Sequence, residues 1–288
     1  MLNLHKVTDN SIEKVTENFE PLKPFIRWAG GKQNLVKVLS ENLPKNGFGK
    51  YFEPFVGAGS LFFFNNFRSS VISDINPHLI NAYERIKTSP EEIFDHLSFF
   101  KKNISKEHYY LLRSKFNRER EIFTSEQAAT FIFLVHTSFN GIFRVNKKGE
   151  YNVPFGKINP AIPDLPYLKK VQRKLLNCDM HNCMYEDIID KINYNDFIYL
   201  DPPYPPLNDT SFFQHYTIDK FSSTKQQELA SYAKLLSDRG AKVMISNANI
   251  NSIQNLYKSW NISKISTYRY VNCKSERKVV EELIIKNY

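Results

Sequence analysis

Long apolar runs, glycine and cysteine are all scarce in this sequence of 288 residues. The strongest apolar runs, such as residues 131–135, fall far short of the ~18 residues that a membrane-spanning helix needs, which excludes a membrane protein. Glycine occurs 10 times and aromatic residues make up 14% of the chain, which excludes a collagen-like or disordered protein. Three cysteines, an odd number, argue against a disulfide framework and favour a reducing cytoplasm. Residues 1–20 mix charges and have no apolar centre, so we expect no secretory signal.

Acidic residues are the minority among the charged side chains. Lys and Arg total 39 against 30 Asp and Glu, which gives a net charge of +9. A balance of this size favours an anionic partner, with nucleic acid first. Merely basic soluble proteins are also common, so charge alone does not decide the function. The length allows one large domain or two small ones, each able to bury a sizeable core.

Apolar periodicity predicts strands alternating with helices on both sides of a mainly helical block. The strands are predicted over 51–56, 71–74, 196–200, 241–246, 262–267 and 281–286. The helices are predicted over 33–43, 77–87, 90–102, 106–117, 125–136, 224–238 and 249–259. Two short β runs, 142–145 and 151–155, flank a polar turn and indicate a hairpin. This order predicts an α/β fold with an open, mostly parallel sheet.

A run of four residues, Asp201-Pro202-Pro203-Tyr204, directly follows a predicted apolar strand. Loops beyond the carboxyl ends of such strands are where ligands bind in open α/β sheets. Two prolines remove two backbone donors and leave carbonyls free to accept hydrogen bonds, so a carboxylate and a proline carbonyl could together hold one exocyclic amino group. A tyrosine offers a face on which a base can stack. A proline-rich turn with a structural aspartate explains the four residues about equally well.

Glycine-containing turns mark two further candidate sites. The first follows the strand at 51–56 and contains Gly57 and Gly59, with Asp74 at the end of the next strand, where an acid can bind ribose hydroxyls. Asp74 could instead cap the helix that begins near Pro77. The second turn, residues 25–32, ends in Gly31-Lys32, but it lacks the other residues of a phosphate-binding loop, which argues against an NTPase.

Together, these motifs resemble the adenine-N6 DNA methyltransferases of the Dam type, from about residue 24 to near the C-terminus. The resemblance rests on the segments 27–32, 52–59, 139–146 with 152–156, and 201–204, in that order. It implies a Rossmann-like, seven-stranded, S-adenosylmethionine-dependent methyltransferase sheet with a helical plus β-hairpin DNA-recognition insert. The expected organisation is an N-terminal extension over 1–22, a catalytic domain over 23–88 and 177–288, and the inserted target-recognition domain over 89–176.

The resemblance also implies a cofactor and the residues of the active site. The cofactor is S-adenosyl-L-methionine, and Asp201 and Pro202 accept hydrogen bonds from N6 of a flipped-out adenine. The expected catalytic residues are Asp201, Pro202, Pro203, Tyr204 and Lys32. The expected cofactor-binding residues are Trp28, Ala29, Gly30, Lys32, Phe52, Glu53, Pro54, Phe55, Gly57, Gly59, Asp74 and Asp201. We expect the loop around 205–221 to move when the base flips.

The hairpin is expected to read double-stranded DNA. The residues that match DNA-contacting positions of the family are Arg27, Phe139, Asn140, Ile142, Arg144, Asn146 and Pro154. An arginine such as Arg144 can contact guanine O6 and N7 together in the major groove. These residues suggest the site GATC, although Ile158 replaces a tyrosine of several GATC readers, and relatives reading GATATC share much of this hairpin.

Several alternatives stay open from the sequence. A methyltransferase of RNA or of a protein amide is one, although amide enzymes usually begin the four-residue motif with Asn; a DNA-binding protein without catalysis is another. The spacing of Cys178, His181 and Cys183 fits no zinc pattern, so no metal is expected. A monomer suffices for this chemistry, a cognate restriction endonuclease could be encoded nearby, and we expect no membrane partner and a cytoplasmic, nucleoid-associated location in a bacterial or phage-infected cell.

Overall fold

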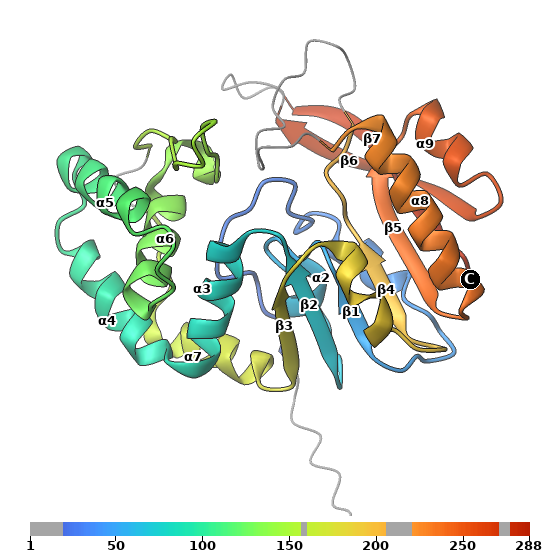
Figure 1. Ribbon diagram of the computed structural model, residues 1–288, viewed down its shortest axis with the longest axis horizontal. Helices are drawn as coiled ribbons and strands as arrows, with labels where there is room; N and C mark the ends of the chain where they lie inside the picture. Colours follow the sequence, from blue (N-terminus) through green and yellow to red (C-terminus); the bar gives the residue numbers. More distant parts are fainter. Residues whose placement is uncertain (1–19, 157–159, 206–220, 271–276) are drawn as a thin grey trace, which may run out of the picture.

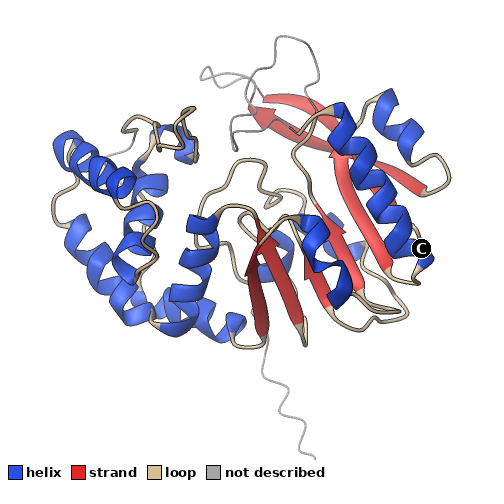
Figure 2. Ribbon diagram, in the orientation of Figure 1, coloured by secondary structure: helices blue, strands red, loops and turns tan. Residues whose placement is uncertain are grey.

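The six predicted strands, and a seventh that the periodicity missed, form one sheet (Figures 1 and 2). The computed structural model describes residues 20–156, 160–205, 221–270 and 277–288. The strands are β1 (Tyr51–Glu53), β2 (Ser70–Asp74), β3 (Cys178–Asn182), β4 (Phe197–Leu200), β5 (Lys242–Ala248), β6 (Asn261–Tyr270) and β7 (Arg277–Lys286). Their order across the sheet is β3-β2-β1-β4-β5-β7-β6. The first five are parallel and β7 is antiparallel to both of its neighbours, so the predicted α/β fold with a mostly parallel sheet is confirmed.

The missed strand, β3, lies at the edge of the sheet and pairs with β2 from Ser70↔Cys178 to Asp74↔Asn182. It has only two apolar residues in five positions, Cys178 and Met180, and only Cys178 is buried. This apolar pattern is too short to predict a strand, and backbone pairing to β2 fixes the segment. A second correction concerns the strand predicted over 51–56, which ends at Glu53 because Pro54 cannot donate to a ladder.

Nine α-helices accompany the sheet in the described part of the chain. They are α1 (Val36–Glu41), α2 (Ser60–Phe64), α3 (Pro77–Thr88), α4 (Pro90–Lys101), α5 (Lys106–Arg118), α6 (Ser125–Thr137), α7 (Leu165–Leu175), α8 (Ser223–Asp238) and α9 (Asn251–Leu256). The segments 33–43 and 249–259 form shorter helices than predicted. The helix α7 was not predicted, although the Asp164 side chain caps it and Pro166 lies in its first turn, which are start signals present in the sequence.

Strand side chains alternate between two apolar layers, one on each face of the sheet. Tyr51 and Tyr199 point into the layer that contains α1, α2, α3 and the helices α4–α7. Phe52 and Ile198 point into the other layer, which contains α8, α9 and the 3-10 helix η2 (Tyr185–Lys191). The core therefore lies on both faces, which leaves the ends of the strands as the place for a site.

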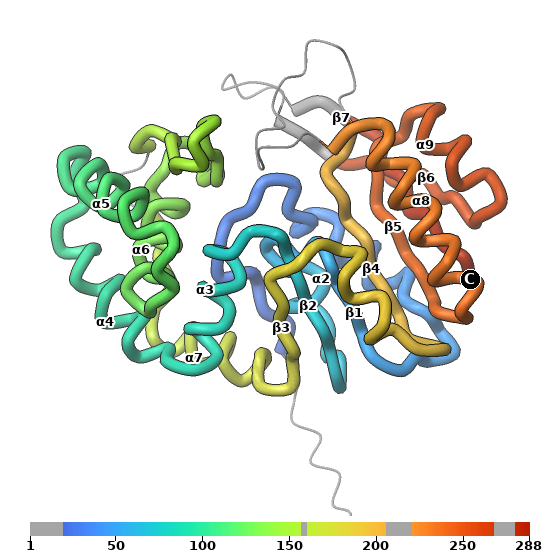
Figure 3. Tube along the Cα trace, in the orientation of Figure 1, coloured from blue at the N-terminus to red at the C-terminus, as the bar shows by residue number. Residues whose placement is uncertain are grey.

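The helices α4, α5 and α6 form a body beside the sheet, with α3 and α7 between them and β3 (Figure 3). The helix α6 is its centre, since nearly all of its residues are buried. Two hydrogen bonds join the chain segments that lead into this body and out of it. Lys87 Nζ on α3 donates to the Cys178 carbonyl of β3 at 2.8 Å, and Gln172 Nε2 on α7 donates to the Lys87 carbonyl at 3.1 Å. The chain thus leaves the sheet layer after α3 and re-enters it at β3 at adjacent points.

The predicted hairpin is corrected in one respect. The chain reverses over 146–149, but 142–145 and 151–155 are not strands: they are joined by the isolated bridge Val145↔Tyr151, and a second bridge pairs Phe155 with Ser138, before the turn at 139–141. Asn140 (φ 59°) and Gly141 (φ 62°) have left-handed backbone within the 3-10 turn η1 (Phe139–Gly141). This turn occupies the start of the outgoing segment, so too few extended residues remain for a continuous ladder. We call residues 139–156 the recognition loop.

Candidate active site

The carboxyl ends of the parallel strands bring acidic side chains to one edge of the sheet. β1 ends at Glu53, β2 ends at Asp74, and Asp201 directly follows β4. The antiparallel β7 places Glu282 opposite Ala248, at the end of β5. The strand order reverses between β1 and β4, and in open α/β sheets ligands bind outside the strand ends at such a point. This edge is therefore the candidate active site.

Lys32, Asp201 and Tyr204 come together there from two distant segments. Lys32 Nζ lies 2.9 Å from Asp201 Oδ1 and donates to the Gly30 carbonyl at 2.8 Å. The same ammonium lies 4.6 Å from the centre of the Tyr204 ring. Lys32 is 7% exposed and Asp201 17%. Burial raises the pKa of the Asp201 carboxyl above its usual value, and the Lys32 ammonium opposes that rise.

Two residues that the sequence analysis missed hold the Asp201 carboxylate. Ser246 Oγ donates to Asp201 Oδ1 at 2.6 Å, and the Tyr199 hydroxyl lies 2.9 Å from Ser246 Oγ. Within the described part of the chain, the contacts of Asp201 with Lys32 and Ser246 both involve Oδ1. The sequence does place Ser246 near the carboxyl end of a predicted strand. That this strand lies beside β4, and so beside Asp201, follows only from the order of the strands in the sheet.

The loop after Asp201 is fixed by side chains from three elements. The Tyr204 hydroxyl donates to Glu282 Oε2 on β7 at 2.8 Å. Gln226 Nε2 on α8 donates to the Pro203 carbonyl at 3.0 Å, and Asn247 Nδ2 on β5 in turn donates to Gln226 Oε1 at 3.0 Å. The Pro203 carbonyl is thus already paired, so the Pro202 carbonyl is the better candidate for a substrate amino group.

Asp74 braces the turn that follows β1. Its Oδ2 accepts from the Gly57 N–H at 3.1 Å and its Oδ1 accepts from the Asn76 N–H at 2.9 Å. Burial raises the pKa of Asp74 to about 6. The alternative interpretation as a helix cap is wrong, because the Asn76 side chain caps α3 by accepting from the backbone N–H groups of His78 and Leu79.

The turn glycines meet protein side chains. Gly57 (φ 47°) and Gly59 (φ 68°) have left-handed backbone, and a Cβ at these positions would lie 2.7 Å from the Trp28 ring and 2.8 Å from the Tyr83 hydroxyl, respectively. Tyr83 also donates to the Gly57 carbonyl at 3.1 Å. Gly30 (φ 76°) differs, because no heavy atom of another described residue, its chain neighbours aside, lies within 4 Å of the position of its missing Cβ.

Three further predicted cofactor residues pack into the protein. Phe52 is fully buried in the layer of α8, and Phe55 stacks on Tyr185 with ring centres 5.2 Å apart. Glu53 is 2% exposed and accepts from the Tyr51 hydroxyl at 2.8 Å. Burial raises the pKa of Glu53 to about 8, and the Asp201 charge adds to that rise. The two phenylalanine side chains therefore serve packing, and a contact from these positions to a cofactor would come from the backbone.

Residues predicted to read DNA gather on the recognition loop and beside it. Arg27 is exposed and lies over Gly141, where a Cβ would come within 2.6 Å of Arg27 Cδ. Phe139 is 43% exposed, and Asn140 and Pro154 are also exposed. Ile142 is half-buried against the core. The segment 27–32 and the recognition loop, distant in sequence, thus lie side by side.

Two predicted DNA contacts already have partners within the recognition loop. Arg144 Nε donates to Asn152 Oδ1 at 2.8 Å. Asn146 Oδ1 accepts from the N–H groups of Lys148 and Glu150 at 2.9 and 3.0 Å, and its Nδ2 donates to Glu150 Oε2. Asn146 therefore shapes the turn, and a DNA contact by its side chain stays a prediction.

Trp28 joins the recognition loop to the candidate cofactor site. Its ring stacks on Phe143 with centres 5.7 Å apart and an interplanar angle of 14°, and it also contacts Phe131 of α6. Because Trp28 packs over Gly57 as well, one side chain touches the turn after β1, the helical body and the recognition loop.

The comparison with known families decides what this arrangement belongs to. Residues 28–271 match the model of the D12 class N6 adenine-specific DNA methyltransferases. The chain belongs to this family. It is 38% identical to the Type II methyltransferase M.MjaIII of Methanocaldococcus jannaschii over 93% of this chain and 99% of that protein. It is 32% identical to the DNA adenine methylase of Escherichia coli K12 over 91% and 94% of the two chains.

One further relative is consistent with this assignment. The Type II methyltransferase M1.LlaDCHI of Lactococcus lactis is 36% identical over 93% of this chain and 96% of that protein. Precorrin 8W decarboxylase from Methanobacterium thermoautotrophicum, a solved structure, superimposes over 89% of this chain and 88% of that one with a TM-score of 0.36 and 10% identity, a likeness that carries no argument. Membership makes the chain an adenine-N6 DNA methyltransferase. It therefore favours this activity over the methylation of RNA or of a protein amide and over DNA binding without catalysis.

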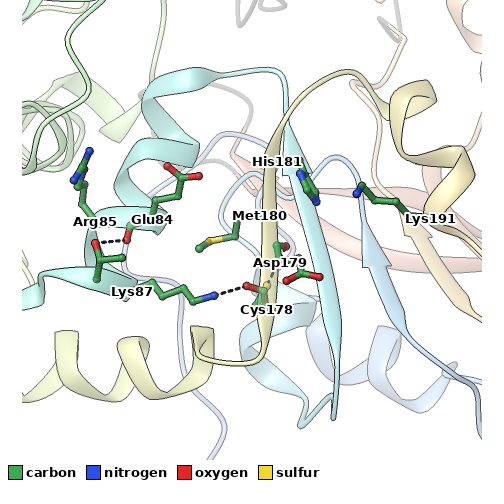
Figure 4. A pocket seen from close by; sticks show the side chains of 9 residues that line it. Glu84, Arg85, Lys87, Cys178, Asp179, Met180, His181 and Lys191 are labelled. Atoms are coloured by element: carbon green, nitrogen blue, oxygen red, sulfur yellow. Dashed lines mark hydrogen bonds between the residues drawn. The ribbon is translucent and has the colours of Figure 1, made fainter.

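One pocket of this D12-class methyltransferase lies away from the candidate active site. A pocket of about 470 Å³ between α3 and β3 contains Cys178 and His181 but none of the predicted site residues (Figure 4). No cluster of three metal-ligating side chains occurs among the described residues, and no described helix could cross a membrane. Ile158, Cys273, residues 1–19 and most of the loop 205–221 lie outside the described residues.

Proposed function

We propose that this chain transfers a methyl group from S-adenosyl-L-methionine to N6 of an adenine flipped out of double-stranded DNA, with GATC as the target. The arrangement of Asp201 supports this most directly. Lys32 and Ser246 bind its Oδ1, so Oδ2 is the acceptor for the substrate amino group. A flipped base is needed because N6 cannot reach a methyl donor inside a stacked duplex.

The residues of the site suit a weak nucleophile. The lone pair of adenine N6 is delocalised into the ring, and two acceptors on its hydrogens favour the pyramidal form that restores the lone pair. Asp201 Oδ2 and the Pro202 carbonyl would be those acceptors, and Asp201 would take the proton that N6 releases on methylation. A base stacked on Tyr204 lies near both the carboxylate and the Lys32 ammonium, which is 4.6 Å from that ring. Positioning and electrostatics thus supply the catalysis, without a covalent enzyme intermediate.

The side chains and backbone at this edge of the sheet also suit S-adenosylmethionine. When bound, this cofactor would supply an activated methyl group on a sulfonium centre. Asp74 presents a carboxylate at the end of β2, with acceptor capacity beyond its two backbone contacts, for ribose hydroxyls. The open space at Gly30 lets a ligand approach the backbone beside Lys32. Trp28, Ala29 and Glu53 would complete the site.

The target sequence rests on the recognition loop. Arg144 and Arg27 would each contact a guanine, and Phe139 would enter the base stack beside the flipped adenine. Asn140, Ile142 and Pro154 would contact the central base pairs. The monomeric state, the nearby restriction endonuclease and the nucleoid location stay predictions.

The test is incubation of the protein with tritiated S-adenosylmethionine and unmethylated plasmid, followed by nucleases that are sensitive to methylation at GATC. Label in N6-methyladenine with full protection at GATC is the expected result. Label without GATC protection would discard the assigned target, with GATATC next to be examined. Absence of label in DNA, with the methyl donor still bound, would overturn the proposal.

A further inference from the structure

Three side chains on one face of α5 bind the backbone of the recognition loop. The Tyr109 hydroxyl and Arg113 Nη1 both donate to the Val153 carbonyl, at 2.8 and 2.9 Å. Asn117 Nδ2 donates to the Tyr151 carbonyl at 3.1 Å, and Asn117 Oδ1 accepts from the Tyr151 N–H at 2.8 Å. We call Tyr109, Arg113 and Asn117 the α5 ladder.

The spacing of the α5 ladder matches the spacing of the backbone that it binds. Residues four apart on an α-helix are separated by roughly 6 Å along its axis. Residues two apart on an extended chain are separated by roughly 6.5 Å, with their backbone groups on the same edge. Arg113 and Asn117 therefore meet Val153 and Tyr151 in order, in the opposite chain direction. Side chains of α5 thus take the place of a neighbouring strand.

The other edge of the same segment is bound to the outgoing half of the recognition loop. The Asn152 N–H donates to the Arg144 carbonyl at 3.1 Å, and the Phe139 N–H donates to the Pro154 carbonyl at 2.8 Å. Burial alternates along the segment: Tyr151 and Val153 are 2% and 1% exposed, whereas Asn152 is half-buried and Pro154 is exposed. The α5 ladder therefore determines which side chains of this segment face outward.

We propose that the α5 ladder sets the register of the recognition loop and thereby determines how strictly the enzyme discriminates its target sequence. The inference rests on the proposed function of this loop as the DNA reader. The members of the α5 ladder are positioning residues: they act through Pro154, which is exposed in this register, and through Asn152, whose Oδ1 accepts from Arg144 Nε. A slip by one residue would exchange the buried and outward side chains of the whole segment, because their period is two.

Asn117 is the member whose chemistry is hardest to replace. Its amide supplies one donor and one acceptor to the same residue, as a paired strand would. Arg113 also lies 4.6 Å from the centre of the Tyr110 ring, so its guanidinium is engaged on the loop side of α5. These contacts give the helix a role in specificity that does not require α5 itself to touch DNA.

The experiment measures kcat/KM on a GATC duplex and on duplexes with one outer base pair changed. In Asn117→Ala, the ratio of kcat/KM on GATC to kcat/KM on the changed duplexes is expected to fall about tenfold or more, since two part-buried hydrogen bonds are lost. Single-turnover rates at saturating GATC duplex should change much less. Tyr109→Phe removes one hydroxyl and keeps the buried ring, so it should lower the ratio by a smaller factor, and it decides the question if Asn117→Ala fails to fold.

The controls separate this inference from the proposed function. Ser114→Ala changes an exposed hydroxyl on the same helix that accepts only from Arg118 among the described residues, and it should leave the ratio unchanged. If Arg144→Ala lowers the ratio but Asn117→Ala and Tyr109→Phe do not, the α5 ladder does not set specificity and the reading function stands. If Arg144→Ala also leaves the ratio unchanged, the recognition loop does not read the sequence and both fail.

Discussion

Asp201 and the residues around it show how a carboxylate can be both buried and presented. Its oxygen Oδ1 binds Lys32 from the segment before α1 and Ser246 from β5, so the side chain is held from two directions. The proposed chemistry needs this rigidity, because two acceptors must meet one amino group in a fixed geometry.

Asp201→Ala is expected to lower single-turnover methyl transfer by about a thousandfold or more, because one of the two N6 acceptors is lost. DNA affinity, measured by fluorescence anisotropy, should stay largely unchanged, since the recognition loop is untouched. Ser246→Ala should lower the rate by roughly tenfold to a hundredfold, the value of a hydrogen bond to a charged group. A normal rate in Asp201→Ala would contradict the assigned mechanism.

Glu53 predicts an unusual dependence of stability on pH. Its pKa is about 8 in the folded protein, against 4.5 ordinarily. Below pH 4.5 the carboxyl is protonated in both states and adds no penalty; as pH rises toward 8, only the unfolded chain gains the charge, so the folded state loses relative stability. Glu53→Gln cannot ionise, so the excess of its free energy of unfolding over that of the parent should be about 4 kcal/mol larger at pH 8 than near pH 4.5. Urea denaturation at both pH values measures this, and an equal difference at both would refute it.

The sequence showed part of this site and not the rest. Residues 201–204 and 27–32 are contiguous motifs whose chemistry could be assigned directly. Ser246, Glu282 and Gln226 could not be assigned, because only the packing of β5, β7 and α8 brings them to residues 201–204. The glycines of the turn after β1 were found, but their neighbours are Trp28 and Tyr83 rather than open space.

At the scale of elements, periodicity located most of the segments that bury an apolar face, although it missed α7, which buries Leu168, Val171 and Leu175. It also missed β3, whose pairing to β2 is carried by backbone groups, and it gave strands where the recognition loop has isolated bridges. That loop is held instead by side chains of α5 and by Trp28 on Phe143. Such contacts between side chains and a distant backbone have no period in the sequence.

Gly141 offers a test of the contact between Arg27 and the recognition loop. Gly141→Ala places a Cβ 2.6 Å from Arg27 Cδ at a φ of 62°, so Arg27 must move. Gly149→Ala is the matched control, with a φ of 76° and, within the part of the chain that the structure describes, no heavy atom within 4 Å of the added Cβ. Both should lose about 1–2 kcal/mol of stability in thermal melting. Only Gly141→Ala should weaken DNA binding, by roughly tenfold, and equal affinities of the two variants would disprove the role of Arg27.

The whole molecule carries a net charge of +9, and its substrate is a polyanion. Phosphate neutralisation releases counterions, so DNA affinity should fall about a thousandfold or more between about 50 and about 200 mM salt if six or more phosphates are bound. Anisotropy titrations at several salt concentrations give the slope. S-adenosylmethionine binding, measured by calorimetry, should change little over the same range, and a flat slope for DNA would argue against a phosphate-dominated interface.

The two hydrogen bonds of Lys87, to Cys178 and from Gln172, tie together the points where the chain leaves and re-enters the sheet layer. A segment whose ends meet can change in length or be exchanged without pulling the central strands apart. Mutations between those points can therefore accumulate while the chemistry at the strand ends is inherited intact. Under the proposed function, a new target sequence would then be written mainly in one contiguous stretch of the gene, with Arg27 as the contribution from outside it.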